Sequence, residues 1–189
     1  QDFINKYMTS SFDKGGLGFD ATIAGSVVGT YWFLMLIGRM IGAAVGAKVS
    51  SKAMLTFVSS LGIILVLAAL FTPIGLQASM PVFRSDISFG LNTIPMSIVF
   101  LVLCGLCTSV MWGGIFNLAV EGLGKYTESA SGFFMVMVCG GGILPLIQGY
   151  FADWLGYINS YWVIVVALVF LFYYALAGYR NVNKDIPVV

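Results

Sequence analysis

The sequence predicts an all-α membrane protein, and three observations carry this prediction. Hydrophobic residues make up 59% of the 189 residues and charged residues only 9%, whereas a soluble domain contains about a quarter charged residues. Five apolar runs are each long enough to cross a hydrocarbon layer of roughly 30 Å at about 1.5 Å per helical residue. These runs are continuous rather than alternating, which argues against strands.

The elements are expected in the following order. Residues 1–9, which include Asn5, look like the final turns of a helix whose beginning is missing. Five complete spans follow at residues 22–48, 53–76, 94–120, 132–152 and 160–179. The chain starts at Gln1 without an initiating Met or a signal peptide, so we expect it to be part of a larger protein.

Lysines and arginines in the connections predict the orientation of the spans. One side of the membrane receives five of them, Lys48, Lys52, Lys125, Arg180 and Lys184. The other side receives three, Lys6, Lys14 and Arg84, together with Asp2, Asp13, Asp20, Asp86 and Asp153. This asymmetry places the connection around residues 48–52, the hinge at 121–129 and the C-terminus in the cytoplasm.

Composition also excludes several classes of function. The net charge of +1 rules out the basic surface that nucleic-acid binding requires, and the absence of His excludes acid–base chemistry by imidazole. Cys104, Cys107 and Cys139 all lie within apolar runs, where a redox or zinc motif is not expected. We therefore predict neither an enzyme nor a metal protein.

The first span carries Gly38, Gly42 and Gly46, whose spacing of four lets two helices approach closely. Static packing and a sliding contact both remain open for this face. Arg39 lies deep in the same span, where a charge costs at least about 2.5–3.5 kcal/mol. We expect Arg39 to face protein, water or a carboxylate on another helix, with extension toward the cytoplasmic interface as the alternative.

The third span places Gly105, Ser109, Trp112 and Phe116 on one helical face. Tryptophan normally prefers the membrane interface, so an indole near the middle of a span indicates either a stacking surface for a sugar ring or core packing. Asn117 and Glu121 follow on a neighbouring face near the cytoplasmic end. Glu121 is a candidate gating residue, with a helical pair to Lys125 as the alternative.

The fourth span combines Gly140, Gly141 and Gly142 with Pro145 and predicts a weakened or kinked helix. Irregular backbone at this depth is tolerated where it lines a cavity or is buried in protein, and transporters build substrate sites from such helices. Gln148, one turn after Pro145, is a candidate to present its amide to the same cavity. Tyr31 of the first span and Asn5 are further substrate-binding candidates.

Three blocks carry a resemblance to a known family. They are IGRMIG at residues 37–42, WGGIFNLAVEGLGKYTESASGF at 112–133 and GGGILPLIQGYFAD at 140–153. The chain resembles the C-terminal half of sugar–proton symporters of the major facilitator superfamily, in the group of the fucose permease and the glucose/galactose transporters. This implies the end of helix seven and the complete helices eight to twelve of a twelve-helix fold, with a C-terminal six-helix bundle.

The resemblance also implies a function and a site. Proton-coupled uptake of fucose, glucose or galactose by alternating access is expected, in a bacterial inner membrane and without a cofactor other than the coupling proton. Trp112 takes the position of a helix-ten tyrosine that contacts sugar, while Gly38, Gly42, Gly141 and Pro145 are structural or gating candidates. The expected partners are the sugar, the lipid bilayer and an N-terminal six-helix bundle that carries the coupling carboxylates, without nucleic acid. An efflux transporter and a non-transporting scaffold or sensor are the alternatives.

Overall fold

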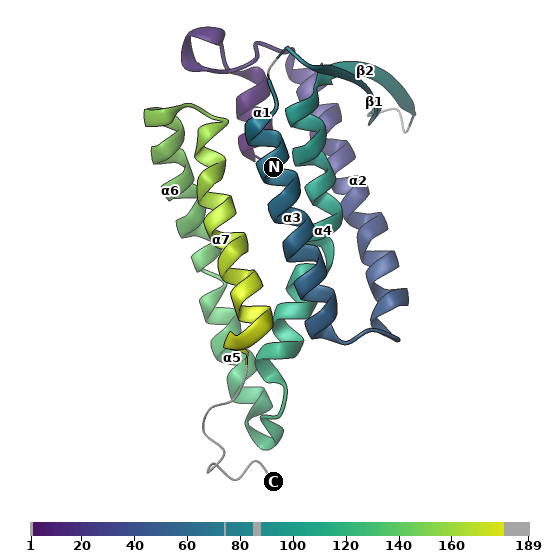
Figure 1. Cartoon of the computed structure of the whole chain (residues 1–189), viewed down its shortest axis with the longest axis vertical. Coiled ribbons are helices and arrows are strands. Elements are labelled where there is room, and N and C mark those ends of the chain that lie inside the picture. The colour runs from purple at the N-terminus through teal and green to yellow at the C-terminus, as the bar shows by residue number, and fades with distance from the viewer. Residues whose placement is uncertain (1, 74, 85–87, 180–189) are drawn as a thin grey trace.

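The computed structural model describes residues 2–73, 75–84 and 88–179, whose helices run side by side in one bundle (Figure 1). Five segments of the described chain are helical, long and apolar enough to cross a membrane. They are Ala21–Gly46, Ser51–Phe71, Met96–Val120, Gly124–Leu155 and Asn159–Gly178. The prediction of a helical membrane protein is confirmed. Asp86, Arg180, Lys184 and the C-terminus, on which the charge count depended, lie outside the described residues.

The elements have the following bounds. The first four helices are α1 (Asp2–Thr9), α2 (Ala21–Gly46), α3 (Ser51–Phe71) and α4 (Met96–Val120). Two strands, β1 (Gln77–Phe83) and β2 (Phe89–Pro95), lie between α3 and α4. The last three helices are α5 (Thr127–Met137), α6 (Gly140–Leu155) and α7 (Trp162–Tyr173). Short 3₁₀ turns precede α5 and α7, and a π-helical turn, Tyr174–Gly178, continues α7.

Side-chain caps begin two of the long helices. The Asp20 Oδ1 atom accepts a hydrogen bond from the Thr22 N–H at 2.7 Å at the start of α2. The Ser50 Oγ atom accepts from the Ala53 N–H at 3.3 Å at the start of α3. Each cap satisfies one of the backbone donors that have no partner inside the helix.

The second span is shorter than the predicted 53–76. Helix α3 ends at Phe71, and Thr72 has extended φ and ψ angles of −77° and 125°. Thr72 precedes Pro73, whose ring disfavours helical angles in the residue before it. The expected boundary at residue 76 is therefore wrong, and the chain leaves the helix five residues earlier.

A β-hairpin replaces the plain connection expected between the second and third spans. Strand β1 pairs antiparallel with β2, with Ser79 opposite Thr93 and Met80 opposite Asn92. Met80 is buried whereas Ser79 is exposed, which is the alternation of a strand with one covered face. Strands were not expected in this chain, and the expectation holds for the described apolar runs but is wrong for this connection. The hairpin also takes the residues before Met96, so α4 begins later than the predicted 94.

The fourth span is broken rather than continuous. Helix α5 ends at Met137 and α6 begins at Gly140, and the connecting turn is tighter than an α-helix. The Gly142 N–H donates to the Cys139 carbonyl at 2.9 Å, three residues back instead of four. Pro145 lies inside α6 and cannot donate to the Gly141 carbonyl. The glycines and the proline thus interrupt the helix, and the whole span extends beyond the predicted 132–152.

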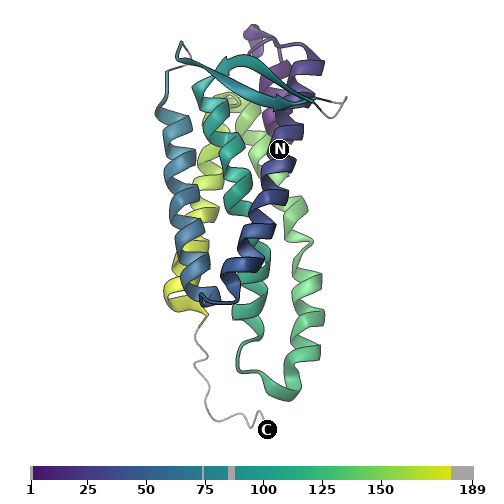
Figure 2. The ribbon, with the colours of Figure 1, turned by 90° about the vertical axis from the view of Figure 1, so that its right-hand side faces the viewer.

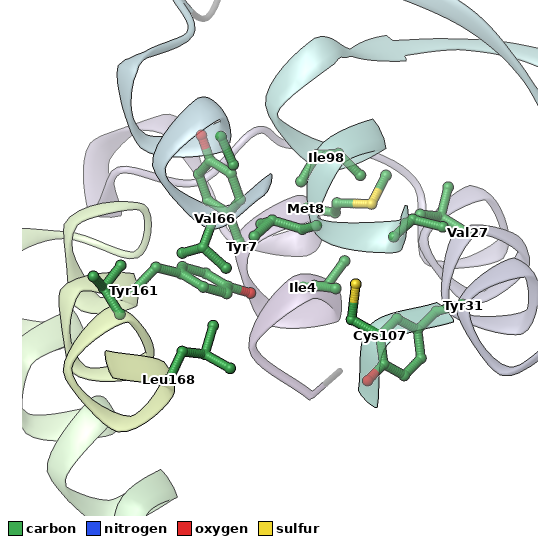
Figure 3. Close-up of a cluster of buried hydrophobic side chains, with 14 of the residues drawn as sticks. Ile4, Tyr7, Met8, Val27, Tyr31, Val66, Ile98, Cys107, Tyr161 and Leu168 are labelled. Carbon is green, nitrogen blue, oxygen red and sulfur yellow. The ribbon is translucent and has the colours of Figure 1, made fainter. Parts of the chain in front are cut away.

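Helix α4 lies at the centre of the bundle, between α2 and α3 (Figure 2). The core contains side chains from α1, α2, α3, α4 and α7, and Figure 3 shows how they converge. By contrast, α5 has no buried residue, and only Gln148 and Ala152 are buried in α6. The fourth span therefore packs loosely against the rest of the described chain.

Candidate substrate-binding face

Trp112 lies outside the hydrophobic core. Its side chain is 47% exposed on the side of α4 that turns away from α3, and the adjacent Gly113 has open space around it. Trp112 stands about 6 Å along the helix from Thr108, the middle residue of α4. A large aromatic side chain is thus available for contact well inside a membrane-length helix. We call the exposed residues Trp112 and Gly113 the Trp112 face.

Two further aromatic rings support this indole. Its ring centroid lies 5.2 Å from that of Phe134 of α5, at an interplanar angle of 62°. Phe134 in turn contacts Phe116 of α4 at 5.4 Å and 73°. Both are edge-to-face contacts, the arrangement that the charge distribution of aromatic rings favours. Sequence reasoning missed Phe134, although the adjacent aromatic pair Phe133–Phe134, six residues before the glycines, was visible.

Two of the other residues predicted on the same helical side as Trp112, Gly105 and Ser109, are buried against α2, whereas Phe116 is half-buried against α5. Ser109 is 7% exposed, and Gly105 lies against the backbone carbonyl of Tyr31. A Cβ atom at Gly38 would overlap the Ser109 side chain, and one at Gly42 would overlap Val110. These glycines therefore let α2 and α4 approach closely, with backbone of the partner helix next to Gly38 and Gly105, as small residues do in membrane helices.

Tyr31 is turned into the bundle. It is 8% exposed, and its hydroxyl lies 3.0 Å from the Thr108 Oγ1 atom across the contact between α2 and α4. Since the hydroxyl already has a partner from the central helix, Tyr31 joins two helices in this conformation. It does not extend the Trp112 face.

The amide candidates also lie apart from one another. Gln148 is buried, and its Nε2 atom donates to the Ser160 Oγ atom at 3.4 Å, toward α7. Asn117 is exposed on α4 and donates to Ser51 at the start of α3 at 3.4 Å. Asn5 is exposed on α1. None of these residues lies on the Trp112 face, since Asn117 follows Trp112 by five residues and is turned by about 140° around α4.

The hydroxyl groups of the first span are bonded to their own helix. Ser26 Oγ donates to the Thr22 carbonyl and Thr30 Oγ1 to the Ser26 carbonyl, each at 2.9 Å. Thr30 Oγ1 also accepts a hydrogen bond at 2.8 Å from the N–H of Phe83 in β1. The hairpin is thereby attached to α2, and Phe33 of α2 stacks on Phe83 with 5.5 Å between centroids.

The charged candidates lie at the surface of the described chain. Arg39 is exposed on α2, and no carboxylate within the described residues forms an ion pair with it. Glu121 is exposed and has extended backbone just after α4, followed by Gly122 at a φ of 76°. The chain turns there, so Glu121 and Lys125 do not share a helix and the predicted helical pair is wrong.

The broken span places its candidates on an open surface. Gly141 has no atom within 4 Å of a Cβ built on it, and Pro145 is exposed. Residues 135–147 are exposed apart from the half-buried Gly140, whereas Phe134 before them and Gln148 after them contact the bundle. The span is thus attached at both ends and open along its middle. Within the described ranges, no three His, Cys, Asp or Glu residues lie close enough to hold a metal ion.

Comparison with known proteins finds distant relatives, although no family model and no solved structure matches the chain. The chain is 29% identical over 164 residues to a glucose/galactose transporter of Brucella abortus, covering 87% of this chain and 35% of that protein. It is 28% identical over 183 residues to a putative glucose/galactose transporter of Helicobacter pylori, covering 94% and 40%. A shorter match, 29% over 86 residues, links 46% of the chain to the L-fucose-proton symporter of Escherichia coli.

The chain is therefore a distant homologue of part of these sugar transporters, and the resemblance predicted from its motifs is confirmed. It spans 35% to 40% of the length of the two glucose/galactose transporters. These relatives are transporters rather than enzymes, in agreement with the prediction from composition.

Proposed function

We propose that this chain is the C-terminal bundle of a proton-coupled transporter that takes up a hexose or deoxyhexose by alternating access. The observation that carries the proposal is Trp112, an indole that is half exposed inside a membrane-length helix and faces a broken neighbouring span. The relatives support it, since their names include glucose, galactose and fucose. The L-fucose relative is a proton symporter by name, which supports the proton as the coupling ion.

The chemistry of the Trp112 face suits a sugar. A pyranose ring has an apolar side made of C–H groups, which packs on an aromatic face and buries area that both partners would otherwise expose. The indole N–H remains a donor for a hydroxyl or ring oxygen of the sugar. Asn117, on a neighbouring face of α4 near its cytoplasmic end, remains a further proposed sugar contact. Asn5 remains a proposed substrate contact, and Arg39 and Glu121 remain proposed gating or structural residues.

The broken span provides the moving part. The glycines and Pro145 weaken the helix where it is open, while Phe134 attaches one end to α4 and Gln148 attaches the other to the turn before α7. In alternating access, one bundle rocks against another around a site near the membrane middle. We assign the covering of the exposed apolar side of α5 and α6 to the N-terminal six-helix bundle of the same protein. The charge asymmetry supports an orientation with the hinge at 121–129 in the cytoplasm, and the bacterial sources of the relatives support a bacterial inner membrane.

The test is uptake of labelled hexoses by the full-length transporter in proteoliposomes with an inward proton gradient. Uptake of fucose, glucose or galactose should accumulate with the gradient and collapse when an uncoupler removes it. Trp112→Ala should reduce uptake strongly, whereas Trp32→Ala, a change of another exposed tryptophan, serves as the matched control. The proposal fails if none of the three sugars enters while a known symporter works in the same vesicles. Export of substrate under the same gradient would favour an efflux transporter instead.

A non-transporting scaffold is the second candidate, and the close contact of α2 with α4 at Gly38 and Gly42 favours it. In a scaffold, these glycines serve assembly and Trp112 has no special role. Gly42→Leu would then abolish function while Trp112→Ala leaves it intact. A transporter requires loss of function in both variants.

A further inference from the structure

Phe134 is the last point at which α5 touches the bundle before the span opens. Helix α5 has no buried residue, and its half-buried residues form one stripe. The stripe consists of Thr127, Ala130, Ser131 and Phe134. Its spacing of three and four places it on a single helical side, and the ring contacts show that this side faces α4. The side chains of the next turn, up to Cys139, are exposed.

The Trp112 indole has few other restraints. Among the described residues, Phe134 is the one aromatic ring in contact with it. On its own helix it is followed by Gly113, which offers no side chain to pack against. Because the two rings meet edge to face, Phe134 supports the indole without stacking on it, and 47% of Trp112 stays exposed. Phe116 supports Phe134 in the same way from α4.

The position of Phe134 relative to the break gives this contact a consequence. The break at Val138 and Cys139 begins one helical turn after Phe134. A change of angle at the break moves α6 while α5 keeps its attachment to α4. A movement of α6 at the break therefore does not change the orientation of the Trp112 indole.

We infer that Phe134 is a positioning residue, which holds the Trp112 indole in the orientation that stacks on the sugar. This inference rests on the proposed function and deepens it. An aromatic pair contributes enough beyond area burial to change an equilibrium by about two- to tenfold. Loss of the Phe134 ring frees the indole to rotate, so the sugar must then select the productive orientation from several. Affinity for sugar falls, and the movement of the loaded transporter does not change.

The experiment measures sugar exchange by the full-length transporter in proteoliposomes, with KM and maximal rate determined separately. Phe134→Ala should raise KM by about two- to tenfold while the maximal rate stays within about twofold. Phe134→Tyr keeps the ring and should restore KM, whereas Phe134→Leu keeps apolar bulk without a ring and should not. Phe133→Ala is the matched control, because Phe133 is 76% exposed and has no ring contact among the described residues.

Each outcome decides the inference. An unchanged KM in Phe134→Ala, a full rescue by Phe134→Leu, or an equal effect of Phe133→Ala overturns it while the proposed function stands. If Phe134→Ala does not fold, the comparison of Phe134→Leu with Phe134→Tyr gives the same decision. Absence of hexose exchange by the wild-type transporter overturns the proposed function and this inference together. If the wild type transports sugar but its Trp112→Ala variant binds sugar normally, the proposed binding site and this inference are overturned. The proposed transport activity then stands.

Discussion

Gly38→Ala should destabilise the bundle, because its new methyl group has no room between α2 and α4. A Cβ atom at this position would lie 2.9 Å from the Ser109 Cβ and 3.0 Å from the Leu106 carbonyl oxygen. The hydroxyl of Ser109 can rotate, but the carbonyl belongs to the backbone of the central helix and cannot. Both helices must separate to admit the methyl group.

The magnitude follows from the cost of overpacking. Inserting a methyl or methylene group into a filled contact costs about 1–3 kcal/mol, and the backbone partner favours the upper part of this range. The higher helix propensity of Ala than of Gly offsets at most about 1 kcal/mol of this cost. We therefore expect a net loss of about 1–2 kcal/mol in the free energy of unfolding. At Gly42 the methyl group would overlap Val110, whose branched side chain has restricted rotation in a helix, so Gly42→Ala should also be destabilising.

Gly25 provides the internal control for this prediction. It lies on the same helix, and a Cβ atom there has nothing within 4 Å. Gly25→Ala should therefore be neutral or stabilising. Reversible unfolding of the full-length protein in mixed detergent micelles measures all three variants against the wild type. If Gly38→Ala proves as stable as Gly25→Ala, the helices are not in backbone contact and the reasoning is refuted.

Three other changes test separate contacts. Thr30→Val removes the acceptor for the Phe83 N–H, which should cost about 1 kcal/mol and speed proteolysis of the hairpin; an unchanged cleavage rate would show that the hairpin is held elsewhere. Tyr31→Phe loses the contact with Thr108 and should lower the melting temperature without changing the KM for sugar, so a raised KM would return Tyr31 to the binding site. Hydrogen bonds from Thr22 in the first turn of α2 lower the pKa of Asp20 below its ordinary value of 3.8. The ionised Asp20 carboxylate therefore stabilises the fold above pH 3.8, and this stabilisation is lost as the pH falls through the lower pKa of the folded state. Asp20→Asn should remove this part of the acid dependence of the melting temperature, and identical pH profiles of variant and wild type would contradict it.

The membrane spans could be predicted from the sequence because bilayer thickness sets the length of an apolar helix. The break in the fourth span was also predictable, since three successive glycines and Pro145 weaken a helix wherever they occur. The end of α3 depends on Thr72 and Pro73. The proline disfavours helical angles at Thr72, and this local effect ends the helix although apolar residues follow. Hydropathy alone extends that helix too far.

The hairpin and the details of the site could not be obtained in this way. The alternation around Met80 covers seven residues, too few to stand out beside runs of more than twenty. Whether Tyr31 or Gln148 faces a cavity or a neighbour depends on helix rotation, which composition does not determine. The contact between Trp112 and Phe134 joins residues from two helices across a turn. Its prediction requires the packing of α5 on α4, and no local pattern contains that information.

The hairpin limits which parts of this chain can change shape. Strand β2 enters α4 directly at Pro95, without a flexible linker, and the neighbouring strand is fastened to α2 through Thr30 and Phe33. Further along, Gly38 and Gly42 of α2 leave no room against α4. Within the described residues, α2 and α4 are therefore joined both at the hairpin and at Gly38 and Gly42, and we expect them to tilt as one rigid body. We therefore expect bending in the fourth span, which neither the hairpin nor these glycines hold.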